Sequence, residues 1–293
     1  MSEREGNDWS RVGLVLEGGG MRAVYTAGVL ECFAEHEVIF PYVIGVSAGA
    51  CMATSYLSRQ RHRNRVVNID YATDPRYLSW GNLWRKRQVF GMDFIFDEIP
   101  SRLVPFDFET FLTTPEQMVV GTTDCETGEP VYYAKNEPDF NTLTVLRASS
   151  SLPFMAPIVE YKGRKLLDGG ISDPIPVRKA ELDGCPRNVV ILTRNEGYRK
   201  KPNSYGWLLR RAFRAYPELV RAMLHRHEVY NATLDYIEHS AKEGSTFIIR
   251  PEVPLVVGRV ERNPAKLEAL YRQGYEDAER LLPALREWAG TGL

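Results

Sequence analysis

The chain has 293 residues, of which 44% are hydrophobic and 26% charged, a composition that is ordinary for a globular protein. The 37 Lys and Arg residues are balanced by 38 Asp and Glu residues, and a formal net charge of −1 excludes a general electrostatic attraction to nucleic acid. A chain of this length can bury a core that is stable without disulfide or metal cross-links.

Neither the cysteines nor the beginning of the sequence indicate an exported protein. The four cysteines lie far apart and form no C-x-x-C pair, so we expect buried thiols rather than a disulfide framework or a zinc site. The opening residues, MSEREGNDWSR, are polar and lack the apolar segment of a signal peptide. No window approaches the roughly 18 consecutive apolar residues of a membrane span. We therefore expect a cytoplasmic location, with peripheral contact at a membrane surface left open.

The first 60 residues read as two strand–helix units. Residues 12–17 form an apolar run that ends at three glycines, and residues 21–36 carry apolar side chains near helical spacing. Residues 42–46 repeat the strand pattern and residues 48–59 the helical one. This order favours a mostly parallel sheet covered by helices, an α/β fold with three layers. The remaining predicted strands are 117–125, 130–134, a hairpin in PIVEY and RKLLDGG, 188–194 and 245–251, and the predicted helical regions are 204–243 and 264–289.

The glycine turn after the first strand has two functional interpretations. GGGMRA fits G-x-G-x-x-[GA] between a strand and a helix, which is the pattern of a dinucleotide-binding loop. Such a loop expects an acidic residue at the end of the second strand, and GVSAGA has none there. Successive glycines beside a helix N-terminus can also point backbone N–H groups at the oxyanion of an acyl-transfer intermediate. A plain tight turn needs fewer than three glycines.

Ser47 is the candidate nucleophile. Gly45-Val46-Ser47-Ala48-Gly49 fits G-x-S-x-G in the strand–turn–helix context that this motif requires. Gly45 and Gly49 relieve crowding where the chain reverses, so that the hydroxyl stands exposed above the strand end. The alternative is that Ser47 only caps the following helix.

A serine nucleophile needs a base, and no histidine is well placed to be one. His36, His62, His225, His227 and His239 all fall in helical or arginine-rich segments, with His225 and His227 the least unsuitable. Asp168 follows a predicted strand directly and precedes Gly169 and Gly170, which leave its carboxylate accessible. A carboxylate that is hydrogen-bonded to a hydroxyl in a shielded site can take the proton. Three further acids read as turn or cap residues: Asp97, Asp124 and Asp173.

These three motifs stand in the order that is found in patatin-like phospholipases. GGGMRA, GVSAG and DGG resemble that family, as do residues 147–177 around Asp168 and the segment TTDCETGEPVYY. The resemblance covers roughly residues 11–190 and departs at Ala23, where the family usually has Gly. It implies a serine lipid acyl hydrolase with a Ser–Asp dyad, in which Ser47 is the nucleophile and Asp168 the base, and which needs no metal or organic cofactor. The oxyanion hole that it implies consists of Gly18, Gly19, Gly20, Met21 and Arg22.

The end of the chain carries no motif that assigns a function. We expect a catalytic core in residues 11–195 and a mostly helical extension in residues 196–293, packed on the core and contributing a strand near 245–251. Residues 207–227 interleave apolar and arginine residues, a pattern that fits a helix on an anionic membrane surface or, as we favour, one that packs on the core and solvates its arginines. Pro217 should divide this stretch. Two rival functions remain, a nucleotide-binding oxidoreductase and a non-catalytic lipid-binding protein of the same fold.

Overall fold

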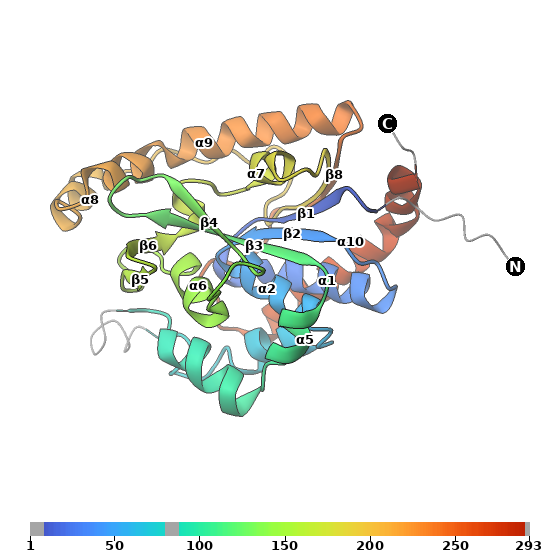
Figure 1. Cartoon of the computed structure of the whole chain (residues 1–293), viewed down its shortest axis with the longest axis horizontal. Helices are drawn as coiled ribbons and strands as arrows, with labels where there is room; N and C mark the ends of the chain where they lie inside the picture. Colours follow the sequence, from blue (N-terminus) through green and yellow to red (C-terminus); the bar gives the residue numbers. More distant parts are fainter. Residues whose placement is uncertain (1–8, 80–87, 291–293) are drawn as a thin grey trace, which may run out of the picture.

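A central sheet organises the computed structural model, which describes residues 9–79 and 88–290 (Figure 1). The sheet has eight strands in the described part of the chain. Their bounds are β1 (Val12–Leu16), β2 (Tyr42–Val46), β3 (Gln117–Asp124), β4 (Pro130–Ala134), β5 (Val159–Tyr161), β6 (Arg164–Asp168), β7 (Arg187–Ile191) and β8 (Thr246–Ile249).

The sheet is parallel at its centre and antiparallel at one side. The strand order is β5-β6-β3-β2-β1-β7-β8, with β4 also paired to β3. The strands β3, β2, β1, β7 and β8 run parallel, whereas β4 and β6 run antiparallel to β3 and β5 antiparallel to β6. The carboxyl ends of β1 and β2 therefore lie side by side. Because β6 returns antiparallel to β3, its last residue, Asp168, is paired with Thr122 near that same edge.

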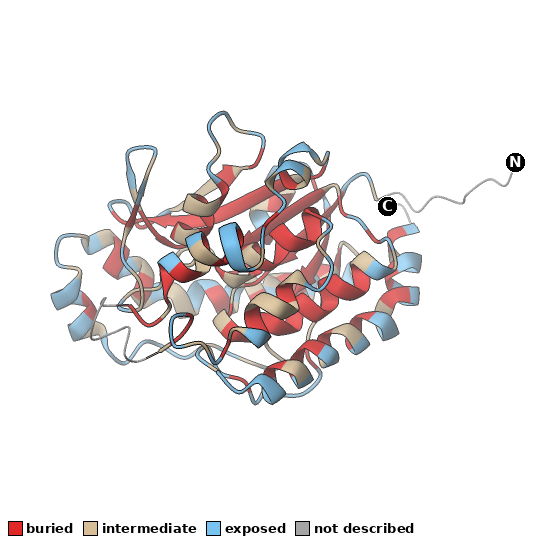
Figure 2. Cartoon of the chain, turned by 90° about the horizontal axis from the view of Figure 1, so that it is seen from below, coloured by how far each residue is buried: buried red, intermediate tan, exposed pale blue. Residues whose placement is uncertain are grey.

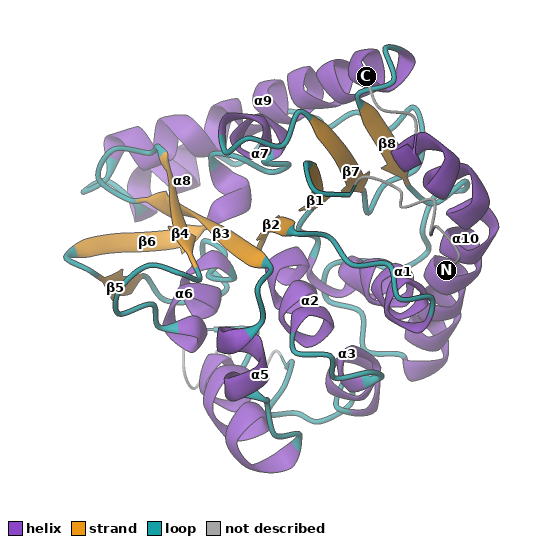
Figure 3. Cartoon of the chain, turned by 45° about the vertical axis from the view of Figure 1, so that its right-hand side comes forward, coloured by secondary structure: helices purple, strands orange, loops and turns teal. Residues whose placement is uncertain are grey.

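Helices cover both faces of the sheet, which confirms the expected three-layer α/β fold (Figures 1 and 3). One face carries α1, α2 and α10, and the other carries α7 and α9. The helical segments are η1 (Gly20–Ala23), α1 (Val24–Glu35), α2 (Ala48–Leu57), α3 (Arg63–Arg65), η2 (Val66–Asp70), η3 (Phe94–Leu103), α5 (Phe108–Thr113), α6 (Thr142–Ser149), η4 (Gly169–Ile171), α7 (Val177–Leu182), α8 (Gly206–Ala212), α9 (Pro217–Lys242) and α10 (Pro264–Gly290).

The central strands are buried on both faces, as continuous apolar runs in a parallel sheet should be (Figure 2). Leu14 and Leu16 of β1 point into the cluster that holds α1, α2 and α10, whereas Val15 between them points into the cluster of α7 and α9. This alternation is the period of two that a strand imposes on its side chains. The sheet therefore holds the ends of β1 and β2 in fixed positions.

The extension after residue 195 is built into the same body. Its strand β8 pairs with β7 at the edge of the sheet, and its helix α10 packs along α1. Helix α8 ends at Ala212 and α9 begins at Pro217, so Pro217 divides the basic stretch as expected. Leu209 of α8 and Leu219 of α9 are buried, but Trp207 of α8 is 69% exposed. Helix α8 therefore does not bury all of its apolar side chains.

Candidate active site

Three loops meet at the carboxyl edge of β1 and β2. The glycine loop Gly18–Gly20 follows β1, Ser47 follows β2, and Asp168 ends β6 beside them. Gly18 lies against Ser47, since a Cβ atom added to Gly18 would come within 2.9 Å of the Ser47 Cβ. Gly18, Ser47 and Asp168 line one cavity together. The fold thus brings together the three motifs that are separated in the sequence.

Ser47 sits on a sharp turn between β2 and α2. Its backbone has φ 54° and ψ −133°, a conformation that side-chain-bearing residues rarely adopt and that is typical of functional sites. Its N–H donates to Ser149 Oγ (2.8 Å), and Ser149 Oγ donates to the Gly121 carbonyl (2.6 Å). The Ser47 side chain makes no capping hydrogen bond to α2. The interpretation of Ser47 as a helix cap is therefore wrong.

Close backbone packing explains the glycines of this turn. A Cβ on Gly49 would come within 2.6 Å of the Glu17 carbonyl oxygen, because the start of α2 passes directly over the end of β1. On Gly169, a Cβ would overlap the carbonyl oxygen of Gly121. These contacts are with backbone atoms, which cannot move aside as a flexible side chain would. The two glycines hold the turns of Ser47 and Asp168 against neighbouring strands.

Asp168 is almost completely buried and held by several hydrogen bonds. Its backbone N–H donates to the Ser151 carbonyl (2.9 Å), and its Oδ1 accepts from Gly170 N–H (2.8 Å). Burial raises the pKa of Asp168, while the positive charge of Arg226 and the hydroxyl of Ser47 oppose this rise. Oδ2 is buried and has no partner of good hydrogen-bond geometry among the described residues, although the Ser47 hydroxyl is near enough to favour the carboxylate form.

The glycine loop leaves backbone donors free beside Ser47. No hydrogen-bond partner for the N–H groups of Gly18, Gly19 and Gly20 is present in the described part of the chain. Met21 differs, because its N–H donates to the Arg259 carbonyl (3.1 Å). We therefore leave Met21 out of the proposed set of oxyanion donors. The buried Arg22 guanidinium lies at the same cavity, and burial together with nearby arginines lowers its pKa to about 10.

An apolar cavity of about 940 Å³, including its open mouth, begins at Ser47. It extends between α2, α6 and η3, and its walls are mainly aliphatic, methionine and phenylalanine side chains. Lining residues that define it are Met52, Val67, Met92, Phe96, Ile99 and Leu146. Such a cavity has the chemistry and the size for a hydrocarbon chain.

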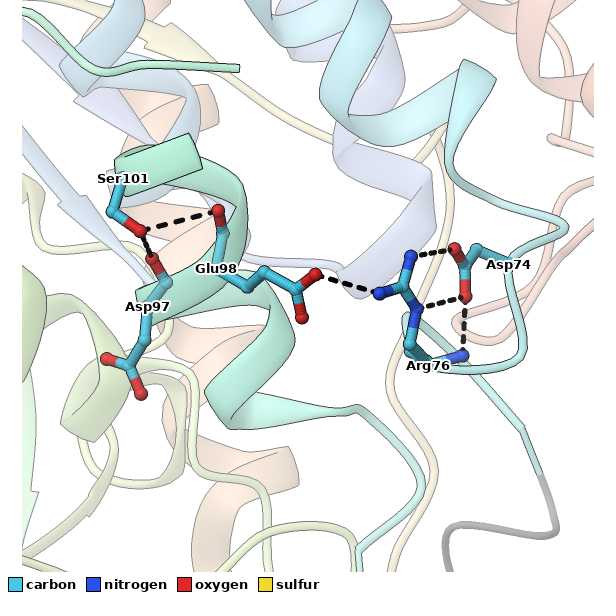
Figure 4. Close-up of polar contacts among 5 residues, drawn as sticks. All are labelled: Asp74, Arg76, Asp97, Glu98 and Ser101. Atoms are coloured by element: carbon cyan, nitrogen blue, oxygen red, sulfur yellow. Dashed lines mark hydrogen bonds and ion pairs between the residues drawn. The ribbon is translucent and has the colours of Figure 1, made fainter. Parts of the chain in front are cut away.

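A cluster of polar contacts anchors η3, which forms one wall of this cavity (Figure 4). Arg76 donates to Glu98 of η3 (2.8 Å) and to Asp74 (2.8 Å), and its guanidinium stacks on the Phe94 ring at 4.3 Å. Within η3, the Ser101 hydroxyl bonds to backbone carbonyls one turn earlier. Arg76 thereby ties η3 to the loop after η2.

A second cavity, of about 480 Å³ including its open mouth, also begins at Ser47 and is polar. Asp168 and the glycine loop line it. Leu152 and Gly20 line both cavities together with Ser47, so the serine stands where the two spaces meet.

The other candidates for the base lie elsewhere. None of the five histidines, all of which the structure describes, lines either of these cavities. Each of the three further acids has its own partner: Asp97 pairs with Arg147 (2.7 Å), Asp124 with Arg164 (2.7 Å), and Asp173 accepts from the Tyr132 hydroxyl (2.5 Å). Among these acids, only Asp168 shares a cavity with Ser47.

The sequence does not identify several residues that lie at the site. Ser149 has no motif of its own, and the basic pattern around Arg226 predicts a solvated arginine, whereas its Nε donates to the Gly170 carbonyl. Lys200 and Arg259 lie in loops without any sequence signature. The run of serines before Asp168 hinted at Ser149, but nothing in the sequence indicated where the other three side chains lie.

Comparison with known proteins matches two parts of the chain. The family model of patatin-like phospholipases matches residues 14–181, more than half of the chain, and a domain of unknown function, DUF6363, matches residues 216–290. An uncharacterized protein of Escherichia coli, YjjU, is 29% identical over 84% of this chain and 70% of its own length. A probable lipid hydrolase, 463L of Invertebrate iridescent virus 6, is 27% identical over 56% of this chain and 61% of its own.

Longer relatives and one solved structure were also found. Lysophospholipase NTE1 of Scheffersomyces stipitis is 23% identical over 96% of this chain, which spans only 18% of that protein. The crystal structure of VipD from Legionella pneumophila, 14% identical, superposes with a TM-score of 0.47 over 94% of this chain and 67% of that one. With the family model covering all three motifs, the chain belongs to the patatin-like phospholipases, a family of lipid ester hydrolases, as the resemblance implied.

Proposed function

We propose that this protein is a serine hydrolase that cleaves lipid acyl esters through an acyl-enzyme, with Ser47 as nucleophile and Asp168 as its base. The observation that carries the proposal is the position of Ser47, which stands between an apolar cavity and the polar cavity that holds Asp168. The acyl chain would occupy the apolar cavity and the alcohol part the polar one. No histidine is needed in this scheme.

Acylation follows from the positions of the side chains and free amides. Asp168 takes the proton of the Ser47 hydroxyl as Oγ bonds to the ester carbonyl carbon. The N–H groups of Gly18, Gly19 and Gly20 stabilise the resulting oxyanion, with Arg22 adding positive charge. When the intermediate collapses, the carbon–oxygen bond to the leaving alcohol breaks, and Asp168 returns the proton to that oxygen.

Deacylation uses the same groups in the same order. Water enters from the polar cavity, gives a proton to Asp168 and attacks the acyl carbon. The second intermediate breaks the bond to Ser47 Oγ, and Asp168 reprotonates the serine. Burial, which raises the pKa of Asp168, makes this carboxylate a stronger base than an ordinary aspartate.

We also propose that helix α8 contacts a lipid surface. Trp207 is 69% and Tyr205 65% exposed, and Arg210 and Arg211 next to them are exposed as well. Phe154 links this region to the site, because its ring packs edge to face against Phe213 (ring centroids 5.3 Å apart) and it lies two residues from Leu152, which lines both cavities. Exposed aromatic residues beside arginines suit an interface with anionic lipid. None of the helices in residues 9–79 and 88–290 is long and apolar enough to cross a membrane.

Two substitutions test the dyad. Ser47→Ala should abolish labelling by a fluorophosphonate probe, and both Ser47→Ala and Asp168→Asn should lower kcat for ester hydrolysis by at least about 10³-fold. Asp173→Asn, five residues along the chain, is the matched control and should keep wild-type activity. Labelling that persists in the Ser47→Ala protein would disprove the nucleophile. Wild-type protein that neither reacts with the probe nor hydrolyses any lipid ester would instead favour a non-catalytic lipid-binding protein.

A further inference from the structure

Five basic side chains line the polar cavity beside Ser47. Only two carboxylates, Glu17 and Asp168, line the cavity with them. The cations are Arg22, Arg194, Lys200, Arg226 and Arg259. A cavity with this excess of positively charged side chains favours the binding of an anion.

The two carboxylates of the cavity do not balance the charge of these five side chains. Within the described ranges, none of the five forms an ion pair with a carboxylate, whereas arginines elsewhere, such as Arg250, hold two. Glu17 is occupied by neutral donors, since it accepts from Thr193 N–H (2.6 Å) and from the Tyr230 hydroxyl (2.9 Å). Arg22 is buried and the other four side chains are half-buried, and charges gathered in such a site without partners are costly, so the arrangement favours a ligand that supplies the missing negative charge.

Arg226 and Arg259 are bonded to the loops that hold the reacting groups, Arg226 through its side chain and Arg259 through its backbone carbonyl. Arg226 of α9 donates from Nε to the Gly170 carbonyl, next to Asp168. The Arg259 carbonyl accepts from Met21 N–H, at the end of the glycine loop. Both residues belong to the region that matches the domain of unknown function, residues 216–290. The C-terminal extension therefore brings positive charge to the leaving-group side of Ser47.

The aromatic rings of the cavity argue against a choline head group. Quaternary ammonium groups are held by open aromatic faces. Here the Tyr198 ring is covered by Arg194 at 4.4 Å and the Tyr230 ring by Lys200 at 5.3 Å. A trimethylammonium group would meet protein cations where it needs aromatic faces. An unsubstituted phosphate, with oxygens that match the guanidinium fork, meets no such conflict.

We propose that the polar cavity, completed by Lys200, Arg226 and Arg259, binds the terminal phosphate of a glycerol phosphate leaving group, so that the enzyme prefers lipids with an unsubstituted phosphate. This inference rests on the proposed ester hydrolysis at Ser47. It gives the C-terminal extension a role in substrate selection.

Hydrolysis of three lipids with one acyl chain tests the preference. For wild-type protein, kcat/KM for oleoyl lysophosphatidate should exceed that for oleoyl lysophosphatidylcholine and for monoolein by at least tenfold. Lys200→Met and Arg259→Gln should each lower the ratio of lysophosphatidate to monoolein hydrolysis by about tenfold, as expected for loss of a charge-assisted hydrogen bond. Arg199→Gln is the matched control, because Arg199 pairs with Asp235 outside the cavity, and its ratio should equal that of the wild type.

A binding measurement separates this inference from the proposed catalysis. Titration calorimetry on Ser47→Ala protein should show glycerol 3-phosphate binding at least tenfold more tightly than glycerophosphocholine and than inorganic phosphate. Inorganic phosphate that binds as tightly as glycerol 3-phosphate would overturn the assignment to a leaving group. Equal hydrolysis of the three lipids would overturn the preference and leave the dyad intact, whereas absence of fluorophosphonate labelling counts against the dyad alone.

Discussion

Ser149 holds the turn of Ser47 in place, because its hydroxyl accepts a hydrogen bond from the Ser47 N–H (2.8 Å) and donates one to the Gly121 carbonyl (2.6 Å). Ser149 is fully buried, so this bridge connects α6, the Ser47 turn and β3 without solvent. A left-handed backbone at a residue with a side chain needs such support. Ser149 is therefore a positioning residue for the proposed nucleophile.

Removal of that bridge should slow the reaction more than it weakens binding. Ser149→Ala leaves a buried N–H without a partner, which costs about 1–3 kcal/mol, and we expect kcat to fall about tenfold while KM stays near the wild-type value. The rate of fluorophosphonate labelling should fall in parallel, and Ser149→Thr should restore part of it. Ser101→Ala removes a hydroxyl that bonds only to backbone in η3 (Figure 4) and serves as the control. A wild-type labelling rate in Ser149→Ala would contradict the positioning role.

Lys200 should give phosphate recognition a pH dependence. Burial, together with nearby arginines, lowers the pKa of Lys200 to about 7, so the side chain is charged below that pH and becomes neutral above it. The charged and titratable groups that face it are Glu17, Arg22, Arg226, Arg259 and Tyr230. The phosphate keeps nearly constant charge above its second pKa of about 6. We therefore expect KM for oleoyl lysophosphatidate to rise between about pH 6.5 and 8.5, the interval around the pKa of Lys200.

Two controls separate this titration from that of the base. In Lys200→Met the rise in KM should disappear, and with monoolein it should be absent in the wild type, since that substrate has no phosphate. In both cases kcat should still fall at acidic pH. The midpoint of that fall should lie above ~3.9, the ordinary pKa of aspartate, because burial raises the pKa of Asp168. A KM for lysophosphatidate that is flat across this interval in wild-type protein would contradict the assigned role of Lys200.

The contact between α1 and α10 should be sensitive to a single methyl group. A Cβ on Gly28 would overlap the Tyr271 carbonyl oxygen, and one on Gly274 would overlap the Tyr25 carbonyl oxygen, so each helix fits a glycine against the backbone of the other. Gly28→Ala should lower the free energy of unfolding by about 1–3 kcal/mol, measured by urea denaturation. Gly258→Ala meets no atom within 4 Å and should change it little. Wild-type stability in Gly28→Ala would show that the two helices pack less closely.

Lipid-surface contact through α8 can be measured directly. Trp207→Ser removes the most exposed aromatic side chain of this helix, and we expect the fraction of protein that sediments with phosphatidylglycerol vesicles to fall several-fold. Hydrolysis of a short water-soluble ester, which needs no interface, should be unaffected. Leu182→Ser, at a residue 84% exposed on α7, is the control for loss of an exposed apolar side chain. Equal sedimentation of wild type and Trp207→Ser would contradict a role for α8.

The sequence by itself determined the fold class and the three motifs of the site. Apolar runs that end at glycines favoured buried parallel strands with tight turns, and the G-x-S-x-G pattern favoured a sharp turn at Ser47, because these features depend on local backbone geometry. Only the tertiary structure decided that the Ser47 hydroxyl does not cap α2 and that Met21 N–H is already bonded to Arg259.

The sequence also did not predict the positive charge of the polar cavity. Arg226 has the same local pattern as the solvated arginines around it, and Lys200 and Arg259 lie in irregular loops. Whether an arginine is solvated or turned into a cavity depends on how distant segments pack. The motifs thus identified Ser47, Asp168 and the glycine loop as the candidate site. The packing of the C-terminal extension against the glycine loop and Gly170 decided which charged side chains surround that site.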